Sequence, residues 1–549
     1  MPDNDIQWKL GEFQDDVERC FVYLKSQWFL TRLRSKSHDL WASQPIPELS
    51  NRLGWLELPQ DSVSLIPRLE EFTENLGRDG IQQLVLLGMG GSSLAPEVIA
   101  KTFGLNDNSP RFCVCDTTHP GYISGLLKTL NLKKTFFLVS SKSGTTLETM
   151  ALFHFFWKHA VADCNNPGKH FAAITDPGTP LERLAAEKNF REVFTAPPEV
   201  GGRFSALSVF GLLPASILRV ETRKLLKLAE EEFQKTFSGE GEKTASLFLG
   251  AVLSEIGSKK DKLSFLTTPS LRSFPAWLEQ LIAESLGKEG KGLVPVIDEP
   301  LIKPEDYSAD RLFIFYSLKE EKSSEFDSLI KKIVRLGHPV ICFNLTDKEY
   351  LSAEMFRWEV AVAVAGSLLE VHPFNQPDVA LAKSFTKEML ESESKGKEGL
   401  VTYNAWEEGK IRKVMEGWLD SAKERDYISI LAFLSPEAEL YHSLQSLRKC
   451  FLEKSRLATT FGYGPRYLHS AGQLHKGGPN TGLFLQLVDE PEEKLLIPHS
   501  SYTFRDLINA QSRGDYLALK QRGRRVVRIS LGKEPQKAVQ QLIRMTEEL

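Results

Sequence analysis

The chain has 549 residues, of which 42% are hydrophobic and 26% are charged, and its formal net charge is −4. This length predicts three or four domains with sizeable cores, and the composition is that of an ordinary soluble globular protein. The small negative charge, with no long basic run, argues against nucleic acid or an anionic membrane as the main partner.

Targeting and redox signals are sparse. No window holds 18 unbroken apolar residues, and the acidic start from Met1 to Asp5 lacks a signal-peptide pattern, so we expect no membrane span and no leader. The six cysteines are scattered, which favours a reducing cytoplasm over a disulfide scaffold. Cys113 and Cys115 have no further residue at ligand spacing, so we expect buried strand thiols and no metal site.

Hydrophobic periodicity divides the chain into five parts. Residues 1–75 carry helical periodicity, which predicts a helical N-terminal cover. Short apolar runs then alternate with amphipathic ones over residues 76–224 and again over 225–390, which predicts two α/β units with parallel, doubly wound sheets. A charged, glycine-containing stretch predicts a linker at 391–400, and a further α/β segment follows at 401–549.

The expected strands are the compact apolar runs of these units. In chain order they lie at 84–87, 111–115, 135–140, 170–174, 263–267, 312–316, 340–344, 427–434, 483–488 and 525–530.

Two polar turns follow expected strands of the first unit. Gly88 to Ser93 is glycine-rich and leads into a helix; it fits neither a dinucleotide fingerprint nor a P-loop, but suits a small polar ligand. Ser140 to Thr146 brings hydroxyls and a lysine to a helix N-terminus, where free N–H groups favour an anion. Thr145 and Glu148 have capping-box spacing, which places the helix start there.

Because strand carboxyl ends meet at one edge of a parallel sheet, we expect both turns to converge on one crevice and to bind a phosphate. An ordinary polar loop is the alternative.

Three further segments carry residue types suited to proton transfer beside an anion. Arg203 follows two glycines, and a guanidinium close to the backbone suits a phosphate or a developing oxyanion. Gln280 and Glu284 lie one helical turn apart in an apolar stretch, where a carboxylate can serve as a base. Gln376 and Lys383 lie seven residues apart, on roughly one helix face. Taken singly, a loop arginine and a surface glutamate are the simpler interpretations.

A dense polar loop lies in the C-terminal segment, from Tyr463 to Pro479. It holds His469, His475, a glutamine, a lysine, an arginine and four glycines. This density favours a functional loop over a structured connection.

Taken in order, these segments resemble the phosphoglucose isomerase family. The matching stretches are Gly88–Ser92, Ser141–Thr149, Gly201–Ser205, Gln280–Lys288 and Pro373–Lys383. The tail also resembles the isomerase half of bacterial transaldolase–phosphoglucose isomerase fusions, through Gly464–Arg466 and Leu474–Pro479, although no transaldolase half is present.

The resemblance implies two sugar-isomerase (SIS) domains, each a doubly wound α/β sandwich, followed by the C-terminal α/β segment. It implies a cytoplasmic aldose–ketose isomerase of glycolysis and gluconeogenesis that interconverts glucose 6-phosphate and fructose 6-phosphate through an enediolate. A sugar phosphate is the expected partner, no cofactor or metal is expected, and a homodimer is expected. One alternative is a dual phosphoglucose/phosphomannose isomerase, over which Gly201–Arg203 and the helix with Gln280 and Glu284 favour the first. The other is a non-catalytic SIS module, against which Glu284 and Lys383 argue.

The resemblance also implies the roles of individual residues. Glu284 is the expected base, Arg203 the cation that steadies the enediolate, and Lys383 a group near the sugar ring. The expected substrate-binding groups are Gly91, Ser92, Ser141, Lys142, Ser143, Thr146, Gln280 and Gln376.

Opening of the sugar ring needs a proton shuttle, commonly a histidine. Between Glu284 and Lys383, where the family usually carries it, the only histidines are His338 and His372. We therefore expect His475 to serve instead, from the C-terminal segment and across a dimer interface.

Overall fold

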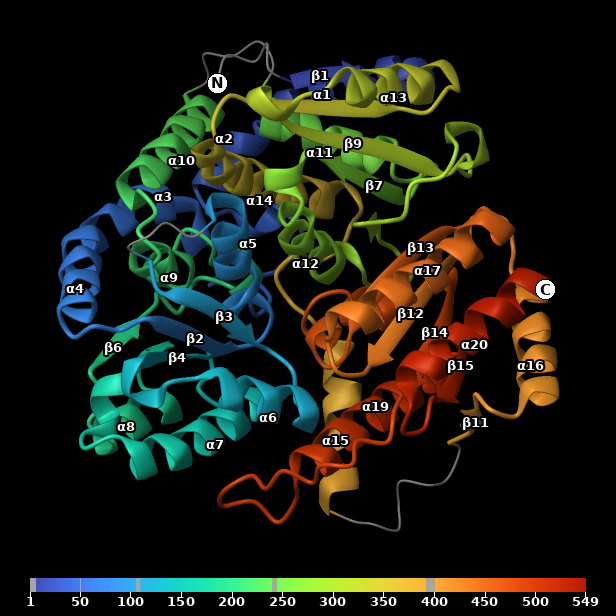
Figure 1. Cartoon of the computed structure of the whole chain (residues 1–549). Coiled ribbons are helices and arrows are strands. Elements are labelled where there is room, and N and C mark those ends of the chain that lie inside the picture. The colour runs from blue at the N-terminus through green and yellow to red at the C-terminus, as the bar shows by residue number, and fades with distance from the viewer. Residues whose placement is uncertain (1–5, 50, 105–108, 239–243, 392–399) are drawn as a thin grey trace.

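The structure, a computed structural model, describes residues 6–49, 51–104, 109–238, 244–391 and 400–549. The acidic start and the linker expected at 391–400, apart from its two end residues, lie outside the described residues. Within them, three five-stranded sheets form three α/β units (Figure 1).

The first sheet is parallel throughout and has the order β3-β2-β4-β5-β6. Its strands are β2 (Gln83–Gly88), β3 (Arg111–Cys115), β4 (Thr135–Ser140), β5 (Phe171–Thr175) and β6 (Glu192–Thr195). Its helices are α4 (Ile66–Arg78), α5 (Leu94–Phe103), α6 (Pro120–Thr129), α7 (Leu147–Asp163), α8 (Pro180–Glu187) and α9 (Val209–Ile217). Leu84 and Leu86 pack into one core and Val85 and Leu87 into another, because helices cover both faces.

The second sheet has the order β1-β10-β9-β7-β8. Its strands are β1 (Ile6–Lys9), β7 (Lys262–Thr267), β8 (Val294–Val296), β9 (Arg311–Leu318) and β10 (Val340–Leu345). The helices of this unit and of the N-terminal segment are α1 (Gln14–Ser26), α2 (Phe29–Arg34), α3 (Leu58–Asp61), α10 (Thr222–Phe237), α11 (Ala245–Glu255), α12 (Phe274–Leu286), α13 (Ser324–Arg335) and α14 (Leu351–Leu368). The N-terminal segment thus supplies an edge strand, antiparallel to β10, that its helical pattern does not predict.

The third sheet is parallel and has the order β11-β15-β14-β12-β13. Its strands are β11 (Tyr403–Asn404), β12 (Tyr427–Phe433), β13 (Ala458–Tyr463), β14 (Gly482–Val488) and β15 (Arg525–Ser530). Its helices are α16 (Glu408–Asp420), α17 (Ala438–Ser455), α18 (Gly472–Gly477), α19 (Phe504–Gln521) and α20 (Pro535–Glu548), and α15 (Val379–Glu391) packs along α19.

Four strands of each sheet follow the same order, in which the first strand of the unit lies between the second and the third. The C-terminal segment is therefore a third unit with the strand order of the first two, and the predicted α/β architecture is confirmed. Figure 1 shows this unit, in orange and red, lying beside α12.

In the described part of the chain, no helix has the length and apolar character needed to cross a bilayer. Those same residues contain no group of three or more His, Cys, Asp or Glu side chains arranged to hold a metal ion.

Candidate active site

The two polar turns of the first unit lie side by side. Strands β2 and β4 are parallel neighbours with Gly88 opposite Ser140, and Ser140 Oγ donates a hydrogen bond to the Ser92 carbonyl at 3.2 Å. Ser141 Oγ and Thr146 Oγ1 are 2.9 Å apart. No side chain caps the N-terminus of α7. Because its first N–H groups lack a side-chain acceptor, the hydroxyls and this helix end together suit an anion.

One lysine and one serine of the second turn, Lys142 and Ser143, have side chains that lie outside this group of hydroxyls. Lys142 Nζ forms an ion pair with Asp176 and donates to the Pro198 carbonyl at 3.1 Å. Burial lowers the pKa of Lys142, although Asp176 partly offsets this. Ser143 is exposed, and its hydroxyl lies 3.0 Å from Thr145 Oγ1. The residues of the two turns that remain grouped at the end of α7 are therefore Ser92, Ser141 and Thr146.

The predicted capping box is wrong. Helix α7 begins at Leu147, no side chain caps it, and the Glu148 side chain is buried. Glu148 Oε1 instead accepts a hydrogen bond from Gln511 Nε2 at 2.7 Å and lies 3.0 Å from His469 Nε2. Burial alone would raise the pKa of Glu148, but the charge and hydrogen bond of His469 bring it below its usual value.

Glycines let three parts of the chain meet at the first turn. A Cβ at Gly91 would lie 2.1 Å from the Gly202 carbonyl oxygen. Gly90 has a φ of +55°, and a Cβ there would lie 2.7 Å from the His469 carbonyl oxygen and 2.8 Å from Gln280 Nε2. No larger residue fits at either position without moving the backbone.

Arg203 and Glu284 form a buried pair beside this junction. Arg203 Nη1 lies 3.5 Å from Glu284 Oε1, and the two side chains are 5% and 8% exposed. Arg203 is held by Ser285 Oγ at 2.8 Å and by the carbonyls of Pro373 and Asn375 at 2.6 and 3.0 Å. Burial lowers the pKa of Arg203, an effect that Glu284 opposes.

The two predicted residues of α12 act together. Gln280 Nε2 donates to Glu284 Oε2 at 3.0 Å and to the His469 carbonyl at 2.8 Å. The helix therefore brings the carboxylate, its amide neighbour and the C-terminal loop to the same place. Nearby, Lys288 Nζ bonds the carbonyl and side-chain oxygens of Asn375 at 2.8 and 3.0 Å. Burial and the charge of Arg203 hold the pKa of Lys288 well below its usual range.

Gln376 and Lys383 are both exposed. Gln376 lies just before α15, and Lys383 lies on it. The charge of Lys383 contributes to the lowered pKa of Glu148, so this lysine lies within electrostatic range of that carboxylate.

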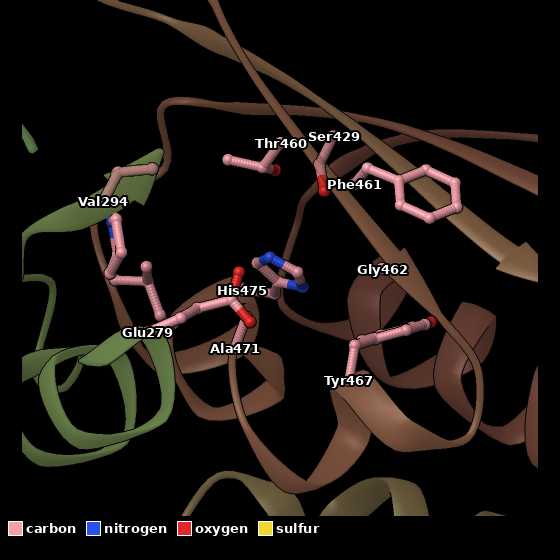
Figure 2. A pocket seen from close by; sticks show the side chains of 11 residues that line it. Glu279, Val294, Ser429, Thr460, Phe461, Gly462, Tyr467, Ala471 and His475 are labelled. Atoms are coloured by element: carbon pink, nitrogen blue, oxygen red, sulfur yellow. The ribbon is translucent and has the colours of Figure 1, made fainter. Parts of the chain in front are cut away.

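His475 lies apart from these groups. It is buried on α18 and lines a pocket between the third sheet and α12. Figure 2 shows His475 pointing into this pocket, near Glu279. Its ring contacts Tyr467 and Phe484, and burial holds the pKa of His475 well below its usual value. Among the described residues, its Nδ1 has no hydrogen-bond partner.

The other two candidate histidines, His338 and His372, are buried in the core of the fold. His372 accepts from the Phe374 N–H at its Nδ1 and lies with Nε2 3.1 Å from the Pro47 carbonyl. Burial lowers the pKa of both His338 and His372 to about 4. The histidine beside Glu148 and Gln280 is His469, for which the sequence gives no signal beyond its place in the polar loop.

Comparison with known proteins agrees with the resemblance to the phosphoglucose isomerase family. Residues 71–294 match the family model of phosphoglucose isomerase. A glucose-6-phosphate isomerase from Thermus thermophilus is 28% identical over 390 residues, which cover 62% of this chain and 91% of that protein. One from Mycoplasmopsis pulmonis is 29% identical over 386 residues, which cover 62% of this chain and 90% of that protein.

Two solved structures are also similar. A hypothetical protein from Thermus thermophilus has a TM-score of 0.60 and 26% identity, over 70% of this chain and 100% of that one. A glucose-6-phosphate isomerase from Chlamydia trachomatis has a TM-score of 0.57 over 71% of this chain and 89% of that one, and at 17% identity it shows the fold alone. Together these matches support an aldose–ketose isomerase of the glucose-6-phosphate isomerase class.

Proposed function

We propose that the protein interconverts glucose 6-phosphate and fructose 6-phosphate through an enediolate, with Glu284 as the base. The observation that carries this proposal is the buried Glu284–Arg203 pair, at 3.5 Å, next to the polar turns Gly88–Ser93 and Ser140–Thr146. We call these two the phosphate turns. The reaction moves a proton between C2 and C1 of the sugar, and one carboxylate can take that proton and return it.

Arg203 stabilises the negative charge that develops on the substrate oxygens. Its guanidinium is fixed by Ser285 and by two carbonyl groups, so little reorganisation is needed when the charge appears. Gln280 holds the second oxygen of Glu284, which fixes the direction of the base.

The phosphate turns anchor the far end of the sugar. Ser92, Ser141 and Thr146 with the N-terminus of α7 supply binding energy remote from the reacting carbons. Gly91 allows this anchor to lie against the turn that carries Arg203.

His469, in place of His475, is the proton shuttle for ring opening. It faces Glu148 at 3.0 Å, and its carbonyl accepts from Gln280, so it lies between the anchor and the base. A carboxylate at one ring nitrogen orients the imidazole. Lys383 supplies a further positive charge on this side.

The purified protein tests the proposal. Conversion of fructose 6-phosphate to glucose 6-phosphate is expected, and binding without conversion would favour the non-catalytic SIS module. Conversion of mannose 6-phosphate as well would establish the dual isomerase.

Further proposals concern the whole protein. The motif from Gly464 to Pro479 supports a C-terminal unit of the type found in transaldolase fusions. All six cysteines, each among the described residues, are free, which supports a reducing cytoplasm. The Glu148–His469 pair lies within one chain, so the expected homodimer is not needed to complete it; light scattering tests the oligomeric state.

A further inference from the structure

One buried chain of hydrogen bonds joins the C-terminal unit to the first unit. Gln511, on α19, is 2% exposed and Thr118 is fully buried. Gln511 Nε2 donates to Glu148 Oε1 at 2.7 Å, and Gln511 Oε1 accepts from Thr118 Oγ1 at 2.6 Å. Since Glu148 Oε1 also lies 3.0 Å from His469 Nε2, the chain runs from Thr118 through Gln511 and Glu148 to His469.

Chemistry fixes the direction of each bond in this chain. An ionised carboxylate only accepts hydrogen bonds, so the amide nitrogen of Gln511 must face Glu148. The amide oxygen is then left for Thr118, whose hydroxyl must donate. Gln511 and His469 therefore both converge on Glu148 Oε1, and both come from the C-terminal unit.

Helix α19 itself is held firmly against α15. A Cβ at Gly514 would lie 2.7 Å from Thr386 Oγ1 and 3.0 Å from the Ala382 carbonyl oxygen, so the two helices approach closely there. Lys383 follows Ala382, and its charge acts on Glu148. Helix α19, which carries Gln511, thus packs against the helix that carries Lys383.

We infer that Gln511 is a positioning residue, which holds the Glu148 carboxylate toward His469 and so makes the C-terminal unit necessary for ring opening. This inference rests on the proposed function, in which His469 is the shuttle.

The experiment compares two substrates that differ in ring formation. Fructose 6-phosphate forms a ring, whereas 5-deoxyfructose 6-phosphate cannot, because its 5-oxygen is missing and its 6-oxygen carries the phosphate. For the full-length Gln511→Met variant we expect kcat/KM for the cyclic substrate to fall about tenfold more than for the open-chain one, since a buried hydrogen bond to a charged group is lost. Thr118→Val should act in the same direction from the other end of the chain, and Thr118→Ser should restore the ratio.

Two further variants separate the possible failures. Gln486→Met is the matched control: Gln486 is buried in the same unit and donates to the Ser512 carbonyl at 3.0 Å, so any loss should be equal on both substrates. His469→Ala should slow the cyclic substrate selectively. If it does while Gln511→Met and Thr118→Val slow both substrates equally, the positioning role is refuted. If His469→Ala slows both substrates equally, His469 is not the proton shuttle for ring opening, and the inference about Gln511 is refuted as well.

Discussion

Replacement of Glu284 by glutamine tests the proposed base with little change in shape. The new side chain keeps its length and a carbonyl oxygen for the hydrogen bond from Gln280, which is 3.0 Å long in the native protein. It has no site that can take a proton at neutral pH. A positioned general base contributes roughly 10²–10⁴-fold to the rate, which is about 3–5 kcal/mol of activation free energy, so kcat should fall by about that factor.

The same change leaves Arg203 without its charged neighbour at 3.5 Å. Breaking a buried ion pair costs about 3–5 kcal/mol of stability when nothing replaces the partner. Here Arg203 keeps its bonds to Ser285 and to the Pro373 carbonyl, at 2.8 and 2.6 Å, so we expect a loss at or below the lower end of that range.

The assay measures kcat with fructose 6-phosphate and, separately, its binding by calorimetry. Binding should persist, because the two turns that bind the phosphate follow β2 and β4 and the substitution leaves their residues unchanged. Glu279→Gln is the matched control. It removes a carboxylate from the same helix, and that carboxylate lines the pocket of His475. An unchanged kcat would remove Glu284 as the base, and a parallel loss of binding would show a structural effect instead.

Three other predictions follow from the same geometry. Burial raises the pKa of Glu279 to about 7 from 4.5, so the folded state is most stable below the unfolded pKa and loses stability as pH rises through 7. Glu279→Gln should therefore gain up to about 3 kcal/mol relative to the native protein between pH 5 and 8 in urea unfolding, and a pH-independent difference would contradict this. Gly91→Ala should abolish measurable turnover, because its Cβ would lie 2.1 Å from the Gly202 carbonyl oxygen; full activity would mean that these turns separate freely. Fructose 6-phosphate at a hundred times its Kd should stabilise the native protein by about 2.7 kcal/mol in thermal unfolding, whereas free glucose, which lacks the phosphate, should have far less effect.

Most of the strands that the sequence predicts are continuous apolar runs inside the parallel sheets, although β3 lies at an edge and is only partly buried. Burial on both faces selects such runs, so the pattern is local and visible, as in β2 and β4. The strands that the sequence does not predict are short or interrupted: β6 has four residues, β8 is Val-Pro-Val, β11 has two residues, and β13 contains two threonines and a glycine. Strand β1 lies in a segment with helical periodicity, and nothing local marks it as a strand because its partner β10 lies more than 300 residues later.

The site residues also divide into those that a local sequence pattern predicts and those whose positions depend on distant parts of the chain. The positions of the two phosphate turns follow from strand order alone, since β2 and β4 are neighbours in the sheet. The direction of Lys142 does not, because it depends on Asp176 from another loop. Glu148 shows the limit most clearly: its spacing from Thr145 predicts a local cap, but its partners His469 and Gln511 lie 321 and 363 residues away.

The choice between His469 and His475 depends on a strand that the sequence did not reveal. Ligands of parallel sheets bind outside the carboxyl ends of the strands, and His469 ends the short 3-10 helix that follows β13. His475, six residues later in the sequence, already lies on α18 and points into the interior toward Glu279. Had β13 been recognised, the rule would have favoured His469, because only that histidine lies in the turn that leaves the strand. The resemblance to the family located the polar loop, but only the strand order of the third unit decides which of its histidines can reach Glu148.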